Sequence, residues 1–307
     1  MALAPNATYT LNDVTVREKI IPDGTRWKDA AKAKAAGFAA NSLYKKQTKL
    51  CGTGKAAYVT IHNTSDIANV SDDGEQLTRA TYNENMASVR VHFYVDELGA
   101  WQNLKAGTGL CKNDPVNSAE VGWHSGDGST VGGGNMSSLA LEIIMNDTSA
   151  HDAKAKDNGA RIAAWLLWKN GLTIDKLVTH TYWVNKAAGK NFRDPDEQCT
   201  NPIKGKKWCP AYIFASNNPT RAMEHWKAFK TLVKSYLDKL NGSVSTVSTG
   251  VSTGVSTGTS TVSTGMSTVS TGTVYRVQVG AFSKKANAET MVKKLKEAGF
   301  EAIITTK

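Results

Sequence analysis

The segment from Val178 to Pro210 most constrains how this chain can fold, because it carries two metal-ligating side chains. His180 follows a short β-branched run typical of a strand end, and Cys209 directly precedes a proline, which stops regular structure. A second histidine, His62, ends a similar run 118 residues upstream. Zinc binds imidazole nitrogen and thiolate tetrahedrally, and three protein ligands leave the fourth position for water. The sequence therefore predicts that His62, His180 and Cys209 bind one Zn²⁺ ion as a cofactor and leave its fourth coordination position open.

A single carboxyl group interrupts the apolar run LALEIIM, which predicts a buried strand. A glutamate in such a strand, here Glu142, costs free energy unless it has a partner or a chemical task. A paired structural carboxylate is the alternative interpretation. Because a hydrolytic zinc site needs a general base nearby, Glu142 is the candidate for that role.

Other patterns predict the elements around these residues. Residues 88–104 alternate β-branched and aromatic residues around a DELG turn, which predicts a β-hairpin. Within it, His92 is interpreted as a hydrogen-bonded sheet histidine. Apolar residues at helical spacing predict helices over 151–172 and 219–240.

The composition changes abruptly after Asn241, which predicts three parts. Residues 1–241 form the first domain, and 242–273, almost wholly Gly, Ser, Thr and Val, form a flexible linker. A β-solenoid is the alternative for this repeat. Residues 274–307 predict a small, separate β-α-β module with an excess of positive charge.

The formal net charge of +10 favours a polyanionic partner, such as nucleic acid, anionic lipid or the anionic polymers of a Gram-positive wall. No arginine-rich block or RNP-like pattern occurs, so we expect no nucleic-acid partner. No apolar window is long enough to span a membrane and no signal peptide is visible, so we expect no membrane insertion. We therefore expect a protein that is made in the cytoplasm; if its substrate lies outside the membrane, something other than its own leader must release it.

Six motifs follow one another between residues 56 and 215: IHNT, HFYVDELGAWQNL, GWHSGDG, GNMSSLALEI, VTHTYW and KWCP. In this order they resemble the zinc-dependent N-acetylmuramoyl-L-alanine amidases of phage endolysins, bacterial autolysins and peptidoglycan recognition proteins. The resemblance implies an α/β (α+β) fold, with a central mixed sheet flanked by helices on both faces. It implies hydrolysis of the amide between N-acetylmuramic acid and the L-alanine of the peptidoglycan stem peptide.

Residue by residue, the resemblance assigns roles across the candidate site. The zinc ligands that it implies are His62, His180 and Cys209. It implies that Glu142 is the acid/base residue and that Lys207 stabilises the tetrahedral intermediate. His124, which is not a ligand, and Trp123 would line the substrate groove.

Two departures from the family pattern concern this site. The position before the His-Phe pair, a catalytic tyrosine in some relatives, is Val91 here. The 29-residue separation of His180 and Cys209 is longer than in many relatives, so Cys199 is an alternative third ligand. Cys209 is favoured because Lys207 and Pro210 flank it as in the family motif.

The C-terminal segment VYRVQVGAFSKKANAETMVKKLKEAGFEA resembles one half of a SPOR (sporulation-related) peptidoglycan-binding repeat. A single half would leave an unpaired sheet edge, so we expect dimerisation through that edge or poor folding alone. Together the two resemblances imply an endolysin that lyses Gram-positive host cells: it stays cytoplasmic until lysis and then acts at the bacterial cell wall. A bacterial autolysin or spore-wall amidase and a non-catalytic peptidoglycan-binding protein are the alternatives.

Overall fold

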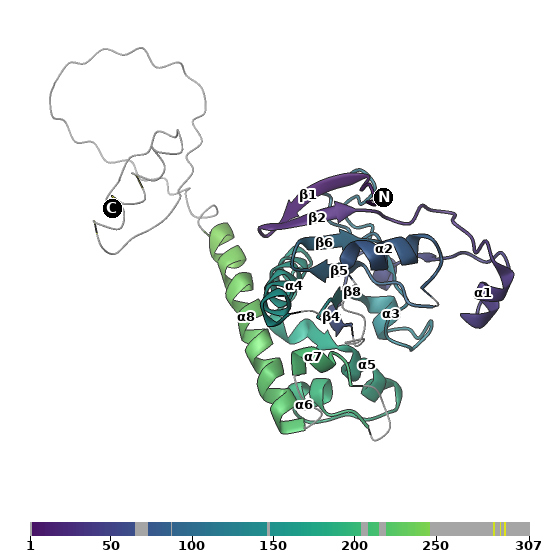
Figure 1. The fold of residues 1–307 in the computed structure, drawn as a ribbon. Helices are drawn as coiled ribbons and strands as arrows, with labels where there is room; N and C mark the ends of the chain where they lie inside the picture. Colours follow the sequence, from purple (N-terminus) through teal and green to yellow (C-terminus); the bar gives the residue numbers. More distant parts are fainter. Residues whose placement is uncertain are drawn as a thin grey trace, which may run out of the picture. The chain divides into compact units, whose positions relative to one another are not determined.

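The computed structural model of the chain describes residues 2–64, 73–86, 88–145, 148–203, 208–214 and 219–245, with residues 285, 289 and 292 (Figure 1). The chain divides into two compact units, Met1–Val251 and Ser252–Lys307. Residues 242–245, predicted as the start of the linker, instead continue helix α8 (Pro219–Ser245), and the rest of the predicted linker lies outside the described residues. So does the predicted C-terminal module with its unpaired sheet edge, apart from Lys285, Glu289 and Val292, which are helical.

A seven-stranded mixed sheet forms the centre of the first unit, with the strand order β1-β2-β6-β5-β8-β4-β9 (Figure 1). The β1/β2 and β5/β6 pairs are antiparallel, and the other neighbours are parallel. The strands of this sheet are β1 (Ala7–Leu11), β2 (Val14–Glu18), β4 (Tyr58–Asn63), β5 (Phe93–Asp96), β6 (Gly99–Gln102), β8 (Ser138–Ile143) and β9 (Leu177–Thr179). The short strands β3 (Lys46–Lys49) and β7 (Glu120–Val121) pair separately. The predicted mixed sheet and the β5/β6 hairpin are confirmed.

Helices pack on both faces of the sheet. The helices are α1 (Ala30–Ala35), α2 (Gly74–Tyr82), α3 (Gly134–Ser137), α4 (Ser149–Lys169), α5 (His180–Ala187), α6 (Pro195–Thr200), α7 (Ala211–Phe214) and α8 (Pro219–Ser245), with 3-10 turns η1 (Leu50–Gly52) and η2 (Ile174–Lys176). Helix α4 covers the face of Phe93 and Ile143, and α8 packs against α4. On the opposite face Leu77 of α2 packs against Tyr94. The two helices predicted from helical spacing are confirmed as α4 and α8.

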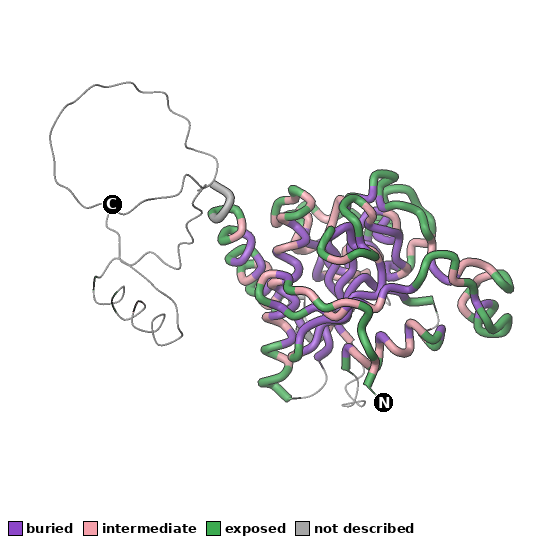
Figure 2. The backbone as a smooth tube through the Cα atoms, turned by 90° about the horizontal axis from the view of Figure 1, so that it is seen from above, coloured by how far each residue is buried: buried purple, intermediate pink, exposed green. Residues whose placement is uncertain are grey.

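Buried residues gather in the sheet and in the helix faces that cover it (Figure 2). Side chains along β4 alternate between the two faces of the sheet, so one face is apolar and the other holds the candidate site residues. Val59 and Ile61 join the apolar core, whereas the intervening Thr60 and His62 lie on the other face. None of the helices in the described ranges is both long and apolar enough to cross a membrane.

His92 is a fully buried histidine directly before β5. Its Nε2 donates to the Glu120 carbonyl oxygen at 2.8 Å, and its Nδ1 accepts from the Ala140 backbone N–H at 3.0 Å. Both ring nitrogens of the neutral form are therefore bonded. Burial lowers the pKa of His92 to about 4. The interpretation of His92 as a hydrogen-bonded sheet histidine is confirmed.

This lowered pKa predicts acid sensitivity. An unfolded histidine has a pKa of about 6.5, so between this value and the folded pKa the unfolded chain binds more protons than the folded protein. The stability contributed by neutral His92 is therefore present above about pH 6.5 and is lost as the pH falls through this window, by about 3 kcal/mol in total. An NMR titration of the His92 ring measures its folded pKa directly, and urea unfolding between these pH values measures the loss. A ring that titrates at the unfolded value would contradict the prediction.

Candidate functional site

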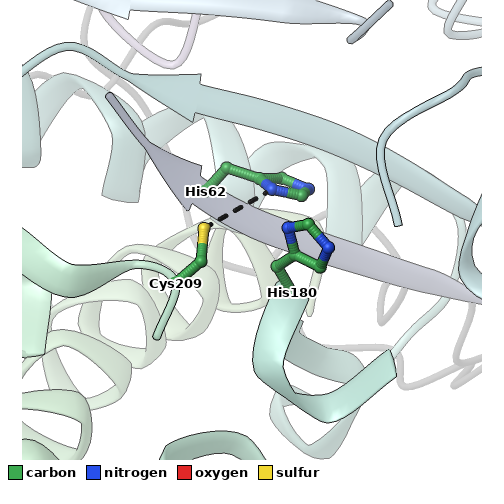
Figure 3. Close-up of side chains that lie close together, drawn as sticks. All are labelled: His62, His180 and Cys209. Carbon is green, nitrogen blue, oxygen red and sulfur yellow. Dashed lines mark hydrogen bonds between the residues drawn. The ribbon is translucent and has the colours of Figure 1, made fainter. Parts of the chain in front are cut away.

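Strands β4 and β9 bring His62 and His180 to the same edge of the sheet. The two strands are parallel neighbours, with Ile61 opposite Thr179. A histidine follows each of these two residues, His62 within β4 and His180 as the first residue of α5, and the two rings lie side by side, with centroids 4.9 Å apart (Figure 3). Parallel pairing thus joins two residues that are 118 positions apart in the sequence.

Cys209 is held beside these histidines by Thr181, in the first turn of α5. The backbone N–H and the hydroxyl of Thr181 both donate to the Cys209 carbonyl oxygen, at 3.2 and 3.0 Å. The Cys209 N–H in turn donates to Thr181 Oγ1 at 3.1 Å. This pairing places Cys209 Sγ 3.7 Å from His62 Nδ1 (Figure 3).

The three side chains fit a zinc ion. One ligand atom from each of His62, His180 and Cys209 lies within 4.8 Å of the other two. Tetrahedral bonds of about 2.0–2.3 Å place zinc ligand atoms about 3.3–3.8 Å apart, which matches the contact between His62 and Cys209. Two imidazole nitrogens and one thiolate form a donor set suited to zinc, and they leave one position open. His62 and Cys209 are buried and His180 is half-buried.

Cys199, the alternative ligand, lies in α6 and is not part of this cluster. Its carbonyl oxygen accepts from Thr179 Oγ1 at 2.7 Å, and α6 packs against α5 and α8. Burial raises the pKa of Cys199 to about 12, so its thiol stays protonated at neutral pH. The geometry therefore favours Cys209 over Cys199.

Glu142 lies beside His62 in the register of the parallel β4/β8 pair. Neighbouring strands are about 4.8 Å apart and paired residues in parallel strands share a face, so the two side chains project to the same side of the sheet. Glu142 is half-buried, with Tyr94 opposite it on β5. Burial raises the pKa of Tyr94, and the charge of Glu142 adds to this effect. Glu142 is thus a direct neighbour of His62, one of the candidate metal ligands.

His124 lies on the other side of His62 from the cysteine. Its Nδ1 is 3.1 Å from His62 Nε2, and burial lowers the pKa of His124 well below its ordinary value. The expected groove-lining role stays a prediction, and the structure adds a contact with a candidate ligand. Trp123 is half-buried, with its ring packed edge-on against Phe38 at 5.3 Å. Lys207 lies outside the described residues.

Sequence reasoning missed the residues that hold the site in place. Thr181 fixes Cys209, and Asn135 fixes the loop of His124 because its Oδ1 accepts from the N–H groups of His124 and Ser125, at 2.8 and 2.9 Å. Asp127 in turn accepts from the Asn135 N–H at 3.2 Å. The polar residues inside the glycine-rich GDGSTVGGGN loop were the available signal.

The assignment of the third ligand can be tested by changing each buried cysteine to serine. We expect Cys209→Ser to weaken zinc binding by more than the roughly 100-fold typical of an outer-shell change, because it removes a direct ligand. Cys199→Ser is the matched control and should bind zinc as the wild type does. Competition with a chromophoric chelator measures the affinities. Zinc loss in the Cys199 variant, with retention in the Cys209 variant, would reverse the assignment.

Two protein-family models match the chain. The N-acetylmuramoyl-L-alanine amidase model matches residues 52–211, which is more than half of the chain. This region contains the cluster of His62, His180 and Cys209 together with Glu142. The SPOR domain model matches residues 271–307.

Curated relatives are found in Bacillus subtilis (strain 168). The N-acetylmuramoyl-L-alanine amidase XlyA is 31% identical over 138 residues, which cover 45% of this chain and 40% of XlyA. The N-acetylmuramoyl-L-alanine amidase CwlA is 27% identical over 233 residues, which cover 76% of this chain and 65% of CwlA. The chain therefore spans less than two thirds of either relative. Among solved structures, a mutant endolysin from Bacillus subtilis is similar, with a TM-score of 0.46 and 23% identity, covering 72% of this chain and 99% of that one.

Proposed function

The chain belongs to the N-acetylmuramoyl-L-alanine amidase family, and on this premise we propose that it hydrolyses peptidoglycan at the amide between N-acetylmuramic acid and the L-alanine of the stem peptide. The observation that carries the proposal is the convergence of His62, His180 and Cys209, with Glu142 beside His62 in the sheet register. The relatives XlyA and CwlA are both named as amidases of this kind, which supports the same reaction.

His62, His180 and Cys209 would hold a single zinc ion. When bound, zinc supplies Lewis acidity toward the scissile carbonyl and a nucleophilic water at neutral pH. Glu142, on the same side of the sheet as His62, takes the proton of the attacking water and returns it to the leaving amine. Lys207, two residues before Cys209 in the sequence, is the candidate residue to stabilise the developing oxyanion with its ammonium group. His124 and Trp123 belong, in this proposal, to the wall of the substrate groove.

The C-terminal part completes the proposal. Residues 1–241 form the catalytic domain, residues 242–273 serve as a linker, and residues 274–307 bind the wall. The SPOR domain match supports wall binding, and the net charge of +10 favours attraction to anionic wall polymers. Dimerisation through the single half-repeat remains part of this proposal. The protein would act on the wall as an endolysin does when host cells lyse, with a bacterial autolysin or spore-wall enzyme as the alternative.

The reaction can be tested on purified Gram-positive walls, with the zinc-loaded and the chelator-stripped protein. We expect new alanine amino termini without new reducing sugar ends, because the proposed bond joins a lactyl group to an amine. The activity should disappear on stripping and return with zinc. Binding to walls without either product would instead indicate a non-catalytic peptidoglycan-binding protein.

Replacing Glu142 tests its role as the acid/base residue. We expect Glu142→Gln to lower kcat about 10²- to 10⁴-fold, because the amide cannot accept the water proton. Zinc content should stay at the wild-type level. Glu97→Gln, which changes a half-buried glutamate in the β5/β6 turn, is the matched control and should keep full activity. Equal activities of the two variants would remove Glu142 from the mechanism.

A further inference from the structure

A line of hydrogen bonds leads from His62 into the protein, away from Cys209. His62 Nε2 lies 3.1 Å from His124 Nδ1, and His124 Nε2 lies 3.4 Å from Ser138 Oγ. Ser138 Oγ is also 2.7 Å from Thr60 Oγ1, which accepts from Trp183 Nε1 at 2.8 Å. The five side chains come from β4, β8, α5 and the loop before α3, so one line of contacts ties these elements to a candidate metal ligand.

The donors in this line can be assigned in one direction, starting from the indole. Trp183 Nε1–H is only a donor, so Thr60 Oγ1 accepts from it. Because the Ser138 hydroxyl gives its own proton to the Gly134 carbonyl oxygen, Thr60 is the donor of the 2.7 Å contact between the two hydroxyls. Ser138 Oγ–H donates to the Gly134 carbonyl oxygen at 2.8 Å, the shorter of its remaining contacts. Ser138 Oγ therefore has only a lone pair left for His124 Nε2, which must carry the proton of that ring.

A neutral imidazole carries one proton, so His124 with N–H at Nε2 offers only a lone pair at Nδ1. The facing atom, His62 Nε2, must then be the donor of their 3.1 Å contact. With its proton on Nε2, His62 presents the Nδ1 lone pair to the Sγ of Cys209, 3.7 Å away. This nitrogen is the one placed to bind a metal ion.

We propose that His124 and Ser138 are positioning residues for His62, which hold its ring in the Nε2–H form with Nδ1 directed at the metal position. The inference rests on the proposed zinc site and adds an outer shell to it. Ligating histidines usually donate their second N–H to a carboxylate, carbonyl or water, and here a second imidazole takes this place. His124, Ser138, Thr60 and Trp183 are all buried, so water does not compete for the bonds.

The tautomers can be measured on the zinc-free wild-type protein. Two-bond nitrogen–proton NMR correlations of histidine-labelled protein distinguish the Nδ1–H and Nε2–H forms. We expect His62 and His124 both to carry their proton on Nε2. A proton on Nδ1 of either ring would reverse the line of donors and overturn the proposal. Because this experiment uses no variant and no metal, its failure is distinguishable from a failure of the proposed zinc site.

Zinc affinity of the full-length variants provides the second readout, by chelator competition. We expect Ser138→Ala and His124→Leu to weaken zinc binding about 10- to 100-fold, the range for outer-shell partners of metal ligands. His124→Asn should restore part of the affinity, because its Oδ1 can accept from His62 Nε2. Ser137→Ala is the matched control, since this buried neighbour bonds the Gly133 carbonyl oxygen instead. Equal zinc affinities of the Ser137 and Ser138 variants would overturn the positioning role proposed for Ser138. A wild-type protein that binds no zinc would instead contradict the proposed function.

Discussion

The parallel pairing of β4 with its neighbours β8 and β9 is the constraint on which the site depends. A shift of one residue in either pairing would move the side chains of one strand to the opposite face. The apolar positions Val59 and Ile61 prevent such a shift, because they are buried in the core beneath α4. The same alternation that stabilises the fold therefore also sets His62 beside Glu142 and His180.

Much of this arrangement could be predicted from the sequence, because strand ends and ligand types are local signals. His62 and His180 each end a β-branched run, and Cys209 has a proline after it. Local signals of this kind do not decide between Cys199 and Cys209 as the third ligand. Lys207 and Pro210 favoured Cys209 only through the family motif. The bonds between Thr181 and Cys209, which hold the cysteine in place, join residues 28 positions apart and leave no periodic trace in the sequence.

The N-terminal part of the sheet shows that the sequence predicts a local turn but not which distant strands pair. The edge strand β1 pairs with β2 around Asn12 and Asp13, whose positive φ values of 47° and 67° form the tight turn of a hairpin. The Asn-Asp pair was a readable turn signal. The parallel pairing of β2 with β6 was not, because it joins Val16 to Ala100 across the sequence. Likewise, the line from His62 through His124 to Ser138 depends on side-chain orientations that only the folded chain defines.

The bonds between Thr181 and Cys209 also bear on how a metal ion would enter and leave. They close the segment between His180 and Cys209 using protein groups alone. Closing a flexible loop of 29 residues costs about 3 kcal/mol of chain entropy, and here folding has already met that cost. Zinc would then bind a site whose ligands are assembled beforehand, so little of its binding energy is used to organise the chain. Metal exchange and folding would then be separate equilibria, unlike in small zinc domains, whose folding requires the ion.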